Sequence, residues 1–313
     1  MKNKDILITG GLGFIGSHIV NSLIDDNVIV ILDNMSTGNI KNLKNPKHEN
    51  LKIHHEDIRN VNFDEITSDI DYILHLAALS NVPQSIAQPS ECYEINFEST
   101  LSLLKSAVKN DVKKIVFSSS SSVYGENENM PLKENETPKP QSPYGISKTK
   151  CELNLKSYYD DYGLNYTALR YFNVFGPGQD ENSQYSAVIP SFINAILHNK
   201  SPVIYGDGNQ TRDFVYITDV VNANINACKS DFNGIINVAS GRKTTINELF
   251  DMIKTALDSD IKPKYLPSRK GDIKYSQADT SNLEKINIEV NQDNFESQIR
   301  CTIDWFKSKY EEG

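Results

Sequence analysis

The chain has 313 residues, of which 38% are hydrophobic and 23% charged, as in an ordinary globular protein with one large domain or two smaller ones. Its formal charge is −9 and no Lys/Arg cluster stands out, which argues against a nucleic-acid partner. No apolar run approaches the roughly 20 residues of a membrane span, and no signal peptide is recognisable, so we expect a cytoplasmic protein without a membrane partner.

The first 170 residues alternate between strand and helix. Ile6–Thr9 is a short apolar run stopped by two glycines, Phe14–Asp25 is amphipathic, and Val28–Leu32 is rich in β-branched residues. Strand, glycine turn, helix and strand form a βαβ unit, and continuous apolar strands indicate a parallel sheet covered on both faces. Further strands are expected at 51–54, 72–76, 114–117 and 165–169, and helices at 87–110 and 143–162. We predict an α/β fold with a Rossmann-type doubly wound parallel sheet.

The pattern loosens after Gly176-Pro177-Gly178. Helices are expected there at 188–198, 217–229, 246–257 and 295–310, and short strands at 202–205 and 235–238. We read residues 1–172 as a dinucleotide-binding domain and 173–313 as a smaller C-terminal α/β domain for the substrate. Some C-terminal segments are expected to return to the first domain.

A glycine turn follows the first strand. Gly10, Gly13 and Gly16 permit the tight turn, the approach of backbone to a pyrophosphate, and close packing of helix on strand. Asp33 ends the second strand, where a carboxylate accepts both ribose hydroxyls and repels a 2′-phosphate, so NAD is favoured over NADP. Asp57 and Ile58 follow the third strand and are candidates for the adenine edge, with an ordinary loop acid as the alternative.

Tyr144 and Lys148 lie one turn apart at the start of a predicted helix. A lysine beside the phenol is expected to lower the pKa of the tyrosine, which then acts as a base toward a carbinol. Serines 118–122 follow the strand predicted at 114–117 and offer a hydroxyl to the same substrate oxygen.

Four motifs together resemble the extended short-chain dehydrogenases, and more narrowly the UDP-glucose and UDP-N-acetylglucosamine 4-epimerases. They are residues 9–16, His75-Leu76-Ala77-Ala78, the segment from Ser118 to Tyr124-Gly125, and Tyr144-Gly145-Ile146-Ser147-Lys148. The resemblance covers the chain from Asp5 to about Ile303. It implies that the catalytic serine stands four residues before Tyr124, at Ser120, with Ser119 and Ser121 as alternatives.

The same resemblance implies further contacts to NAD. Beyond the residues already named, the positions that match are Phe14, Ile15, Asn34, Leu76, Ala77, Ala78, Asn96, Ser118 and Tyr171. Structural roles are the alternative for these small, apolar or amide side chains.

A UDP-sugar site is also implied. Asn173 and two arginines, Arg212 and Arg269, match positions at the diphosphate, where a guanidinium fork suits phosphate oxygens. Asp272 matches the carboxylate at the uridine ribose, Val188 and Tyr205 match positions around the uracil, and Ser120 and Ser121 face the sugar. Each has a surface ion pair or a core position as its alternative.

The two residues directly before Val123-Tyr124 indicate the type of reaction. Related dehydratases carry Asp-Glu there and related decarboxylases a Glu, whereas this chain has Ser121-Ser122, which favours oxidation and re-reduction at C4. UDP-glucuronate 4-epimerases resemble the serine run but typically have Thr at the position of Asn173. A nucleotide-sugar reductase or dehydrogenase is a further hypothesis, and so is an NAD-sensing protein of the same fold.

Ser276 aligns with a position that is bulky in enzymes restricted to UDP-glucose, so we expect UDP-N-acetylhexosamines to be accepted. The segment 184–190 also resembles the N-acetyl-accepting branch, although a slip of one residue would place Tyr275 at the gate. The resemblance further implies a homodimer through the helices near 87–110 and 143–162. The four cysteines form no C-x-x-C pair, so we expect free thiols and no metal site. The sequence leaves the pathway open between galactose use and surface-glycan synthesis.

Overall fold

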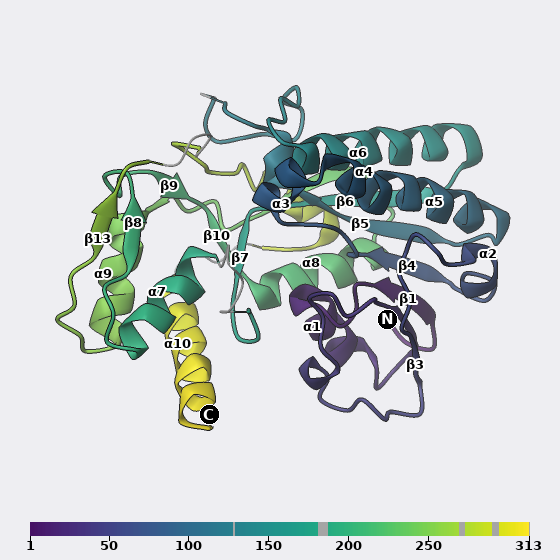
Figure 1. The fold of residues 1–313 in the computed structure, drawn as a ribbon. Helices are drawn as coiled ribbons and strands as arrows, with labels where there is room; N and C mark the ends of the chain where they lie inside the picture. The colour runs from purple at the N-terminus through teal and green to yellow at the C-terminus, as the bar shows by residue number, and fades with distance from the viewer. Residues whose placement is uncertain (128, 181–186, 269–272, 290–293, 313) are drawn as a thin grey trace.

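A seven-stranded parallel sheet forms the larger part of the molecule (Figure 1). The computed structural model describes residues 1–127, 129–180, 187–268, 273–289 and 294–312. The strand order is β11-β6-β5-β4-β1-β2-β3, and every pair is parallel. The strands are β1 (Asp5–Thr9), β2 (Val28–Leu32), β3 (Leu51–His54), β4 (Tyr72–His75), β5 (Lys114–Ser120), β6 (Asn165–Tyr171) and β11 (Gly234–Val238). The predicted Rossmann-type fold is confirmed.

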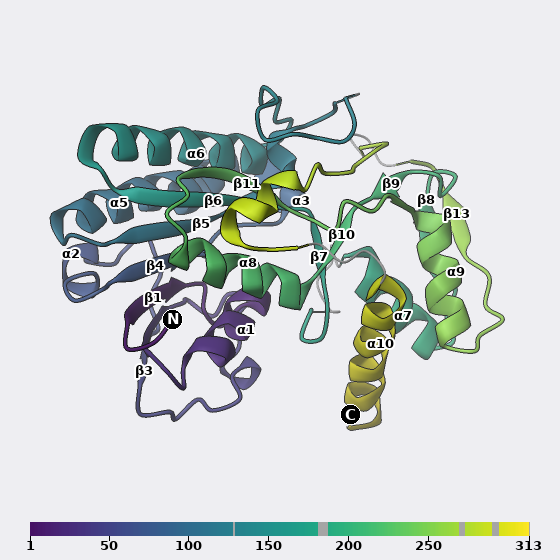
Figure 2. The ribbon, with the colours of Figure 1, turned by 180° about the vertical axis from the view of Figure 1, so that it is seen from behind.

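Helices cover both faces of this sheet. One face carries α1 (Phe14–Leu23) and α8 (Ile217–Lys229), and the other carries α2 (Phe63–Ile66), α5 (Ser99–Lys109) and α6 (Pro143–Tyr162), as Figures 1 and 2 show. The strands read as continuous apolar runs because their side chains alternate between two cores. In β1, for example, Ile6 and Ile8 pack toward α1 while Leu7 packs on the opposite side.

The long helix predicted at 87–110 is interrupted. It consists of α4 (Pro89–Tyr93), a π-helical turn η2 (Glu94–Glu98) and α5, and it follows a separate short helix, α3 (Val82–Ala87). Pro89 has no N–H to continue α3, so a new helix starts there. The π turn contains Asn96, and such turns are frequent at functional sites.

The smaller part of the molecule has its own apolar core. Its helices are α7 (Val188–Leu197), α9 (Ile246–Ala256) and α10 (Phe295–Glu312). Three two-stranded sheets accompany them: β7 (Asn173–Phe175) with β10 (Phe214–Tyr216), β9 (Thr211–Arg212) with β12 (Thr244–Thr245), and β8 (Val203–Tyr205) with β13 (Lys264–Leu266). The remaining elements are the 3₁₀ turns η1 (Ile40–Asn42), η3 (Ser121–Val123) and η4 (Ser281–Ile286).

The chain crosses between the two parts more than once. After β10 it returns to the sheet as α8, which packs on α1, and as β11, which pairs with β6. The division at residues 172 and 173 stays a prediction. Within the described residues, no helix is both long and apolar enough to cross a membrane. All four cysteines are free, and three of them are buried.

Candidate active site

The turn between β1 and α1 is built by its glycines. Gly10 has a φ of +70°, and a Cβ on it would lie 2.8 Å from the Ala77 backbone nitrogen. A Cβ on Gly16 would lie 2.1 Å from the Gly10 carbonyl oxygen, so α1 sits directly on the turn. Gly13, the N-cap of α1, has only the Gly10 oxygen nearby, and the helix start carries neither a side-chain cap nor an acidic residue. This open, uncapped helix N-terminus suits a phosphate group.

Asp33 lies just beyond β2, facing the same turn. The residue is 8% exposed, and its carboxylate accepts hydrogen bonds from the Leu12 and Met35 backbone nitrogens at 3.0 and 2.8 Å. Both bonds hold the acid at the carboxyl edge of the sheet, where open α/β sheets bind their ligands.

Asp57 is engaged by the protein itself. Arg59 donates to it from its backbone nitrogen, Nε and Nη2, and the Asn34 amide donates at 3.2 Å. The side-chain hydrogen bond from Arg59 is the main cause that lowers the pKa of Asp57 to about 2. Ile58 is buried in the core beside α5. Contacts of Asn34, Asp57 and Ile58 with an adenosine stay predictions.

The other predicted cofactor residues surround the ends of β4, β5 and β6. Five of them are half-buried around the glycine turn and the end of β4, namely Phe14, Ile15, Leu76, Ala77 and Ala78. Asn96 is buried. Its amide oxygen accepts a hydrogen bond from the Leu79 backbone nitrogen, and its amide nitrogen donates to the Leu79 carbonyl and the Ser147 hydroxyl. The buried Tyr171 hydroxyl lies between Ser118 and Asn224, at 3.1 and 2.9 Å. The polar groups of Asn96 and Tyr171 therefore already have protein partners, and their role at NAD stays a prediction.

Tyr144 and Lys148 stand in the first turns of α6, which begins with a Ser142 cap and Pro143. Burial raises the pKa of Tyr144 to about 12, while a hydrogen bond with the Ser120 side chain lowers it. Burial lowers the pKa of Lys148 to about 8, and its Nζ lies 5.8 Å from the centre of the Tyr144 ring. Desolvation of the phenol is the main cause of the raised pKa of Tyr144, and a lowering of that pKa by Lys148 stays a prediction.

The pleat of β5 directs successive serines of the run to opposite faces of the sheet. Ser118 donates to the Tyr171 hydroxyl, and Ser119 donates to the Glu152 carboxylate at 2.5 Å, beneath α6. Ser120 is the serine that contacts Tyr144. Ser121 begins the 3₁₀ turn that follows. Ser119 is thus engaged by Glu152, whereas Ser120 lies beside Tyr144, and the catalytic role of Ser120 stays a prediction.

A buried ion pair lies below these serines. Arg170 donates from Nε and Nη2 to the two Glu152 oxygens at 2.9 and 2.7 Å, and the side chains are 1% and 4% exposed. The Arg170 guanidinium also stacks on the Tyr124 ring, 4.6 Å from its centre. The pair joins β6 to α6, and through Ser119 it also joins β5. It therefore braces the strand end that carries Ser120 against the helix that carries Tyr144.

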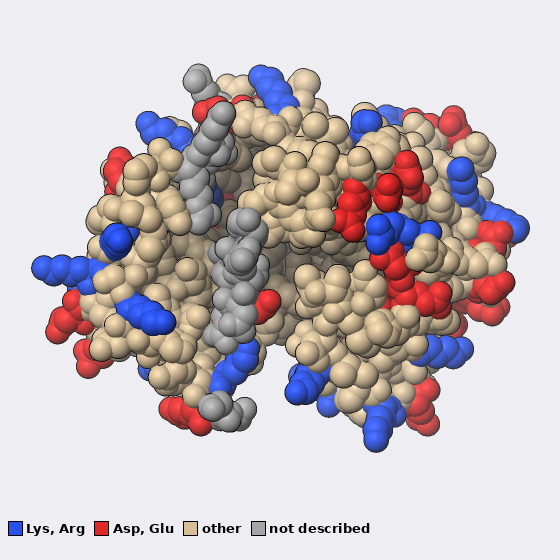
Figure 3. Space-filling view, in the orientation of Figure 1, with Lys and Arg blue, Asp and Glu red and all other residues tan. Residues whose placement is uncertain are grey.

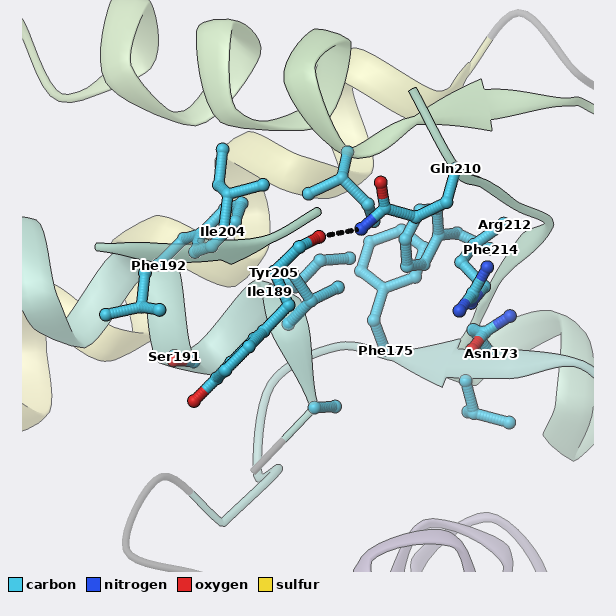
Figure 4. Close-up of a pocket in the computed structure, with 15 residues that line it drawn as sticks. Asn173, Phe175, Ile189, Ser191, Phe192, Ile204, Tyr205, Gln210, Arg212 and Phe214 are labelled. Atoms are coloured by element: carbon cyan, nitrogen blue, oxygen red, sulfur yellow. Dashed lines mark hydrogen bonds between the residues drawn. The ribbon is translucent and has the colours of Figure 1, made fainter. Parts of the chain in front are cut away.

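The smaller part of the molecule contains a pocket (Figure 4). Asn173 and Arg212 lie side by side at one end, and Tyr205 reaches toward the other. Val188 at the start of α7 also lines it, so all four described residues predicted for the diphosphate and uracil come together. The space-filling view shows a hollow between the smaller part and the sheet (Figure 3). Arg269, Asp272 and residues 184–186 lie outside the described residues.

Comparison with known proteins decides the family. Residues 6–239 match the NAD dependent epimerase/dehydratase family. The chain belongs to this family. The predicted family, the enzyme class and the NAD cofactor are confirmed at this level.

Three solved structures of similar proteins carry different sugars. A UDP-N-acetylglucosamine 4-epimerase from Methanobrevibacter ruminantium M1, in complex with UDP-N-acetylmuramic acid, is 56% identical with a TM-score of 0.97, over 99% of this chain and 100% of that one. A UDP-glucose 4-epimerase from Thermotoga maritima with UDP-glucose is 37% identical, with a TM-score of 0.91 over 98% and 99% of the chains. A UDP-glucuronic acid 4-epimerase from Bacillus cereus, in complex with UDP-glucuronic acid and NAD, is 29% identical, with a TM-score of 0.89 over 98% and 100%.

In this member of the epimerase/dehydratase family, Ser276 is buried whereas its neighbour Tyr275 is exposed. Ser276 is 7% exposed, whereas Tyr275 is 42% exposed, and the ammonium groups of Lys243 and Lys274 lie 5.1 and 5.2 Å from its ring centre. The alternative of a tyrosine gate one residue earlier is therefore disfavoured, because that ring faces the surface.

Several residues in or behind the pocket were not predicted from the sequence, among them Gln210 and Asp213. Gln210 lines the pocket and donates from its amide to the Tyr205 carbonyl at 2.6 Å. Asp213 lies fully buried beside Arg212. The available signal for Asp213 was a carboxylate set directly before the apolar run Phe214–Tyr216, where an acid is costly unless it is hydrogen-bonded.

Proposed function

We propose that the protein is a UDP-hexose 4-epimerase that interconverts UDP-glucose and UDP-galactose, and also UDP-N-acetylglucosamine and UDP-N-acetylgalactosamine. The observation that carries the proposal is the contact of Ser120 with Tyr144 at the carboxyl edge of the sheet. The next two residues, Ser121 and Ser122, are hydroxyls and not acids. The site thus has a proton-transfer pair for a carbinol and no carboxyl group at the positions where the related dehydratases carry theirs.

Tyr144 is the base and acid of the reaction. It takes the proton from the C4 hydroxyl and gives it back after the sugar has turned over, while the Ser120 hydroxyl hydrogen-bonds the same oxygen. A phenol with a pKa raised by burial needs a cationic neighbour to ionise, and Lys148, one helix turn away, supplies a positive charge 5.8 Å from the Tyr144 ring centre. The intermediate is a 4-keto sugar that rotates about its phosphate linkage.

The residues present fit NAD. The open face at Gly13 and the uncapped start of α1 suit the pyrophosphate, and the Asp33 carboxylate suits the adenosine ribose. Bound NAD would supply a reversible acceptor for the C4 hydride, which returns to the opposite face of the sugar, so the chain would need no free NAD in stoichiometric amounts.

The pocket would hold the UDP portion. Arg212 and Asn173 bind the diphosphate, and Tyr205 and Val188 enclose the base. In this proposal Arg269 assists at the diphosphate and Asp272 at the uridine ribose. The small, buried Ser276 leaves room for an N-acetyl group.

UDP-glucuronate epimerisation is the second candidate, since the serine run resembles that branch. Asn173 disfavours it, and the glucuronate enzyme from B. cereus has 29% identity to this chain against 56% for the N-acetylglucosamine enzyme from M. ruminantium.

We also propose that the enzyme is a homodimer. Ile86 of α3 and Ile146 and Leu153 of α6 expose 61, 41 and 63% of their surface on adjacent helices. Such a patch favours burial against a second copy. Light scattering after gel filtration should give the mass of two chains; a monomer would contradict this.

The function is tested with purified protein and no added NAD. UDP-glucose, UDP-N-acetylglucosamine and UDP-glucuronate are supplied separately, and the 4-epimers are sought by NMR. Conversion of the first two supports the proposal. Conversion of UDP-glucuronate alone would favour the second candidate, and no conversion even with NAD supplied would leave a reductase or a binding protein.

A further inference from the structure

A single buried carboxylate holds the segments around the sugar-nucleotide pocket. Asp213 is completely buried, between Arg212 of β9 and Phe214 of β10. Its two neighbours line the pocket, but Asp213 does not, because alternate residues of an extended chain point to opposite sides. The acid therefore acts on the pocket from behind.

The carboxylate binds two remote parts of the chain. Oδ1 accepts hydrogen bonds from the Ser240 backbone nitrogen and hydroxyl, at 2.9 and 2.8 Å. Oδ2 accepts from the Gly241 and Ala278 backbone nitrogens, at 3.0 and 3.1 Å. Both oxygens are thus saturated by donors from the loop after β11 and from the segment that contains Ser276.

The backbone around Asp213 holds the remaining pieces. Its carbonyl oxygen accepts from both the backbone nitrogen and the side-chain amide of Asn173, each at 3.0 Å. Arg212 donates to the Ile273 carbonyl at 2.7 Å, and the Thr211 hydroxyl accepts from the Ser276 nitrogen at 3.4 Å. Asn173, Arg212 and Ser276, which lie far apart in the sequence, are therefore linked through three consecutive residues.

From these contacts we propose that Asp213 is a positioning residue for the UDP-sugar, which sets the relative places of Asn173, Arg212 and Ser276 without touching the substrate. This inference rests on the proposed function for the identity of the ligand. Burying a carboxylate is costly even with these four donors, so a role in fold stability alone explains its presence poorly. An apolar side chain would fill the same space at lower cost if the segments did not need to be held in register.

The test is Asp213→Asn in the full-length enzyme with its bound NAD. The amide must place its NH₂ against one pair of donors, so two hydrogen bonds of the cluster are lost. We expect KM for UDP-glucose and Kd for UDP, measured by titration calorimetry, to rise about tenfold or more, as the loss of these two hydrogen bonds implies. The NAD content and kcat should stay within about threefold of wild type, because Tyr144, Lys148 and the glycine turn are untouched.

A matched control separates positioning from general damage. Asp71→Asn also alters an acid that accepts a backbone hydrogen bond, from Asp5 at 3.1 Å, but it lies at the opposite edge of the sheet and should leave KM and Kd unchanged. If Asp213→Asn does not fold, Ser240→Ala removes only the hydroxyl bond to Oδ1 and should raise the Kd for UDP about threefold.

Unchanged KM and Kd in the folded variant, or a fall in kcat with KM unchanged, would overturn the inference. The UDP titration keeps it separate from the proposed function. A wild-type protein that epimerises no UDP-sugar refutes the function, while the ratio of UDP affinities still decides whether Asp213 positions the pocket; a wild-type protein that does not bind UDP refutes the inference.

Discussion

The cofactor side and the sugar-nucleotide side of this enzyme are assembled from the chain in different ways. Around the glycine turn, functional residues follow the ends of neighbouring parallel strands, so each short motif arrives in place with its strand. The pocket side collects residues from strands of two or three residues, a helix start and a loop. The sheet supplies order through its backbone ladder, whereas the pocket depends on one buried acid, Asp213, and its hydrogen bonds.

The largest effect is expected on the catalytic side. In the proposed mechanism Tyr144 exchanges a proton with the C4 hydroxyl, so Tyr144→Phe should lower kcat by about 10³-fold or more. KM for UDP-glucose should change little, because Asn173 and Arg212 are unaffected. Steady-state kinetics with a coupled assay measures both. A variant that keeps a tenth of its kcat would remove Tyr144 from the mechanism.

The next prediction concerns Asp213 and the way its contribution to the free energy of unfolding varies with pH. Burial raises the pKa of Asp213 to about 6, from about 3.9 in an unfolded chain. Between about pH 4 and pH 6 the folded protein therefore binds a proton that the unfolded chain does not. This group stabilises the fold at about pH 4 relative to pH 7 by about 2 kcal/mol, and that contribution is lost as pH rises through about 6.

Urea unfolding of wild type and Asp213→Asn at several pH values isolates this contribution, because the other ionisable groups cancel in the difference. Wild type should gain on the variant by about 2 kcal/mol as pH falls from about 7 to about 4. A difference that does not vary with pH would mean that the acid is not forced to carry its charge in a dry site.

A smaller effect should separate two adjacent serines. Ser120→Ala removes the hydroxyl beside Tyr144 and should lower kcat about thirtyfold, as loss of a hydrogen bond to a developing charge implies. Ser119→Ala removes only the bond to Glu152 and should lower kcat by less than about threefold, as that side chain points beneath α6. The reverse order of the two variants would show that the register is shifted by one residue.

The smallest effect concerns the choice of sugar. Ser276→Tyr places a large ring at a buried position. In the proposed function it should lower kcat/KM for UDP-N-acetylglucosamine by about tenfold or more. UDP-glucose, which lacks the acetyl group, should be spared. Competition between the two substrates measures the ratio directly. Equal loss of both would show that the residue does not act as a gate.

Much of the fold on both sides of the molecule could be predicted from the sequence. The helices predicted at 143–162 and 217–229 have those bounds in the structure, and the first six sheet strands lie within the predicted runs or extend them by a few residues. The two-residue strands β9 and β12 were not predicted, because they are too short to show any periodicity. The π turn at Asn96 was missed for a similar reason, since it differs from an α-helix by about one residue per turn.

Some residues of the functional site could likewise be predicted from the sequence, and others could not. Tyr144, Lys148, Asp33 and the glycines were predicted from motifs whose spacing fixes their geometry. The choice among five consecutive serines needed the pleat of β5, and the importance of Asp213 needed the loops that fold onto it from 27 to 65 residues away. Long-range hydrogen bonds of this kind leave no local pattern in the chain.

The buried pair of Glu152 and Arg170 has a consequence for how this sequence can change over time. Loss of either partner alone leaves an uncompensated charge in the interior, at about 3–5 kcal/mol, which is a large share of the stability of a domain. Replacement of both by apolar residues of similar volume is often neutral. A single substitution at either position is therefore strongly disfavoured in evolution. Related sequences that differ here are expected to have changed both residues together, or to have gained a compensating change elsewhere first.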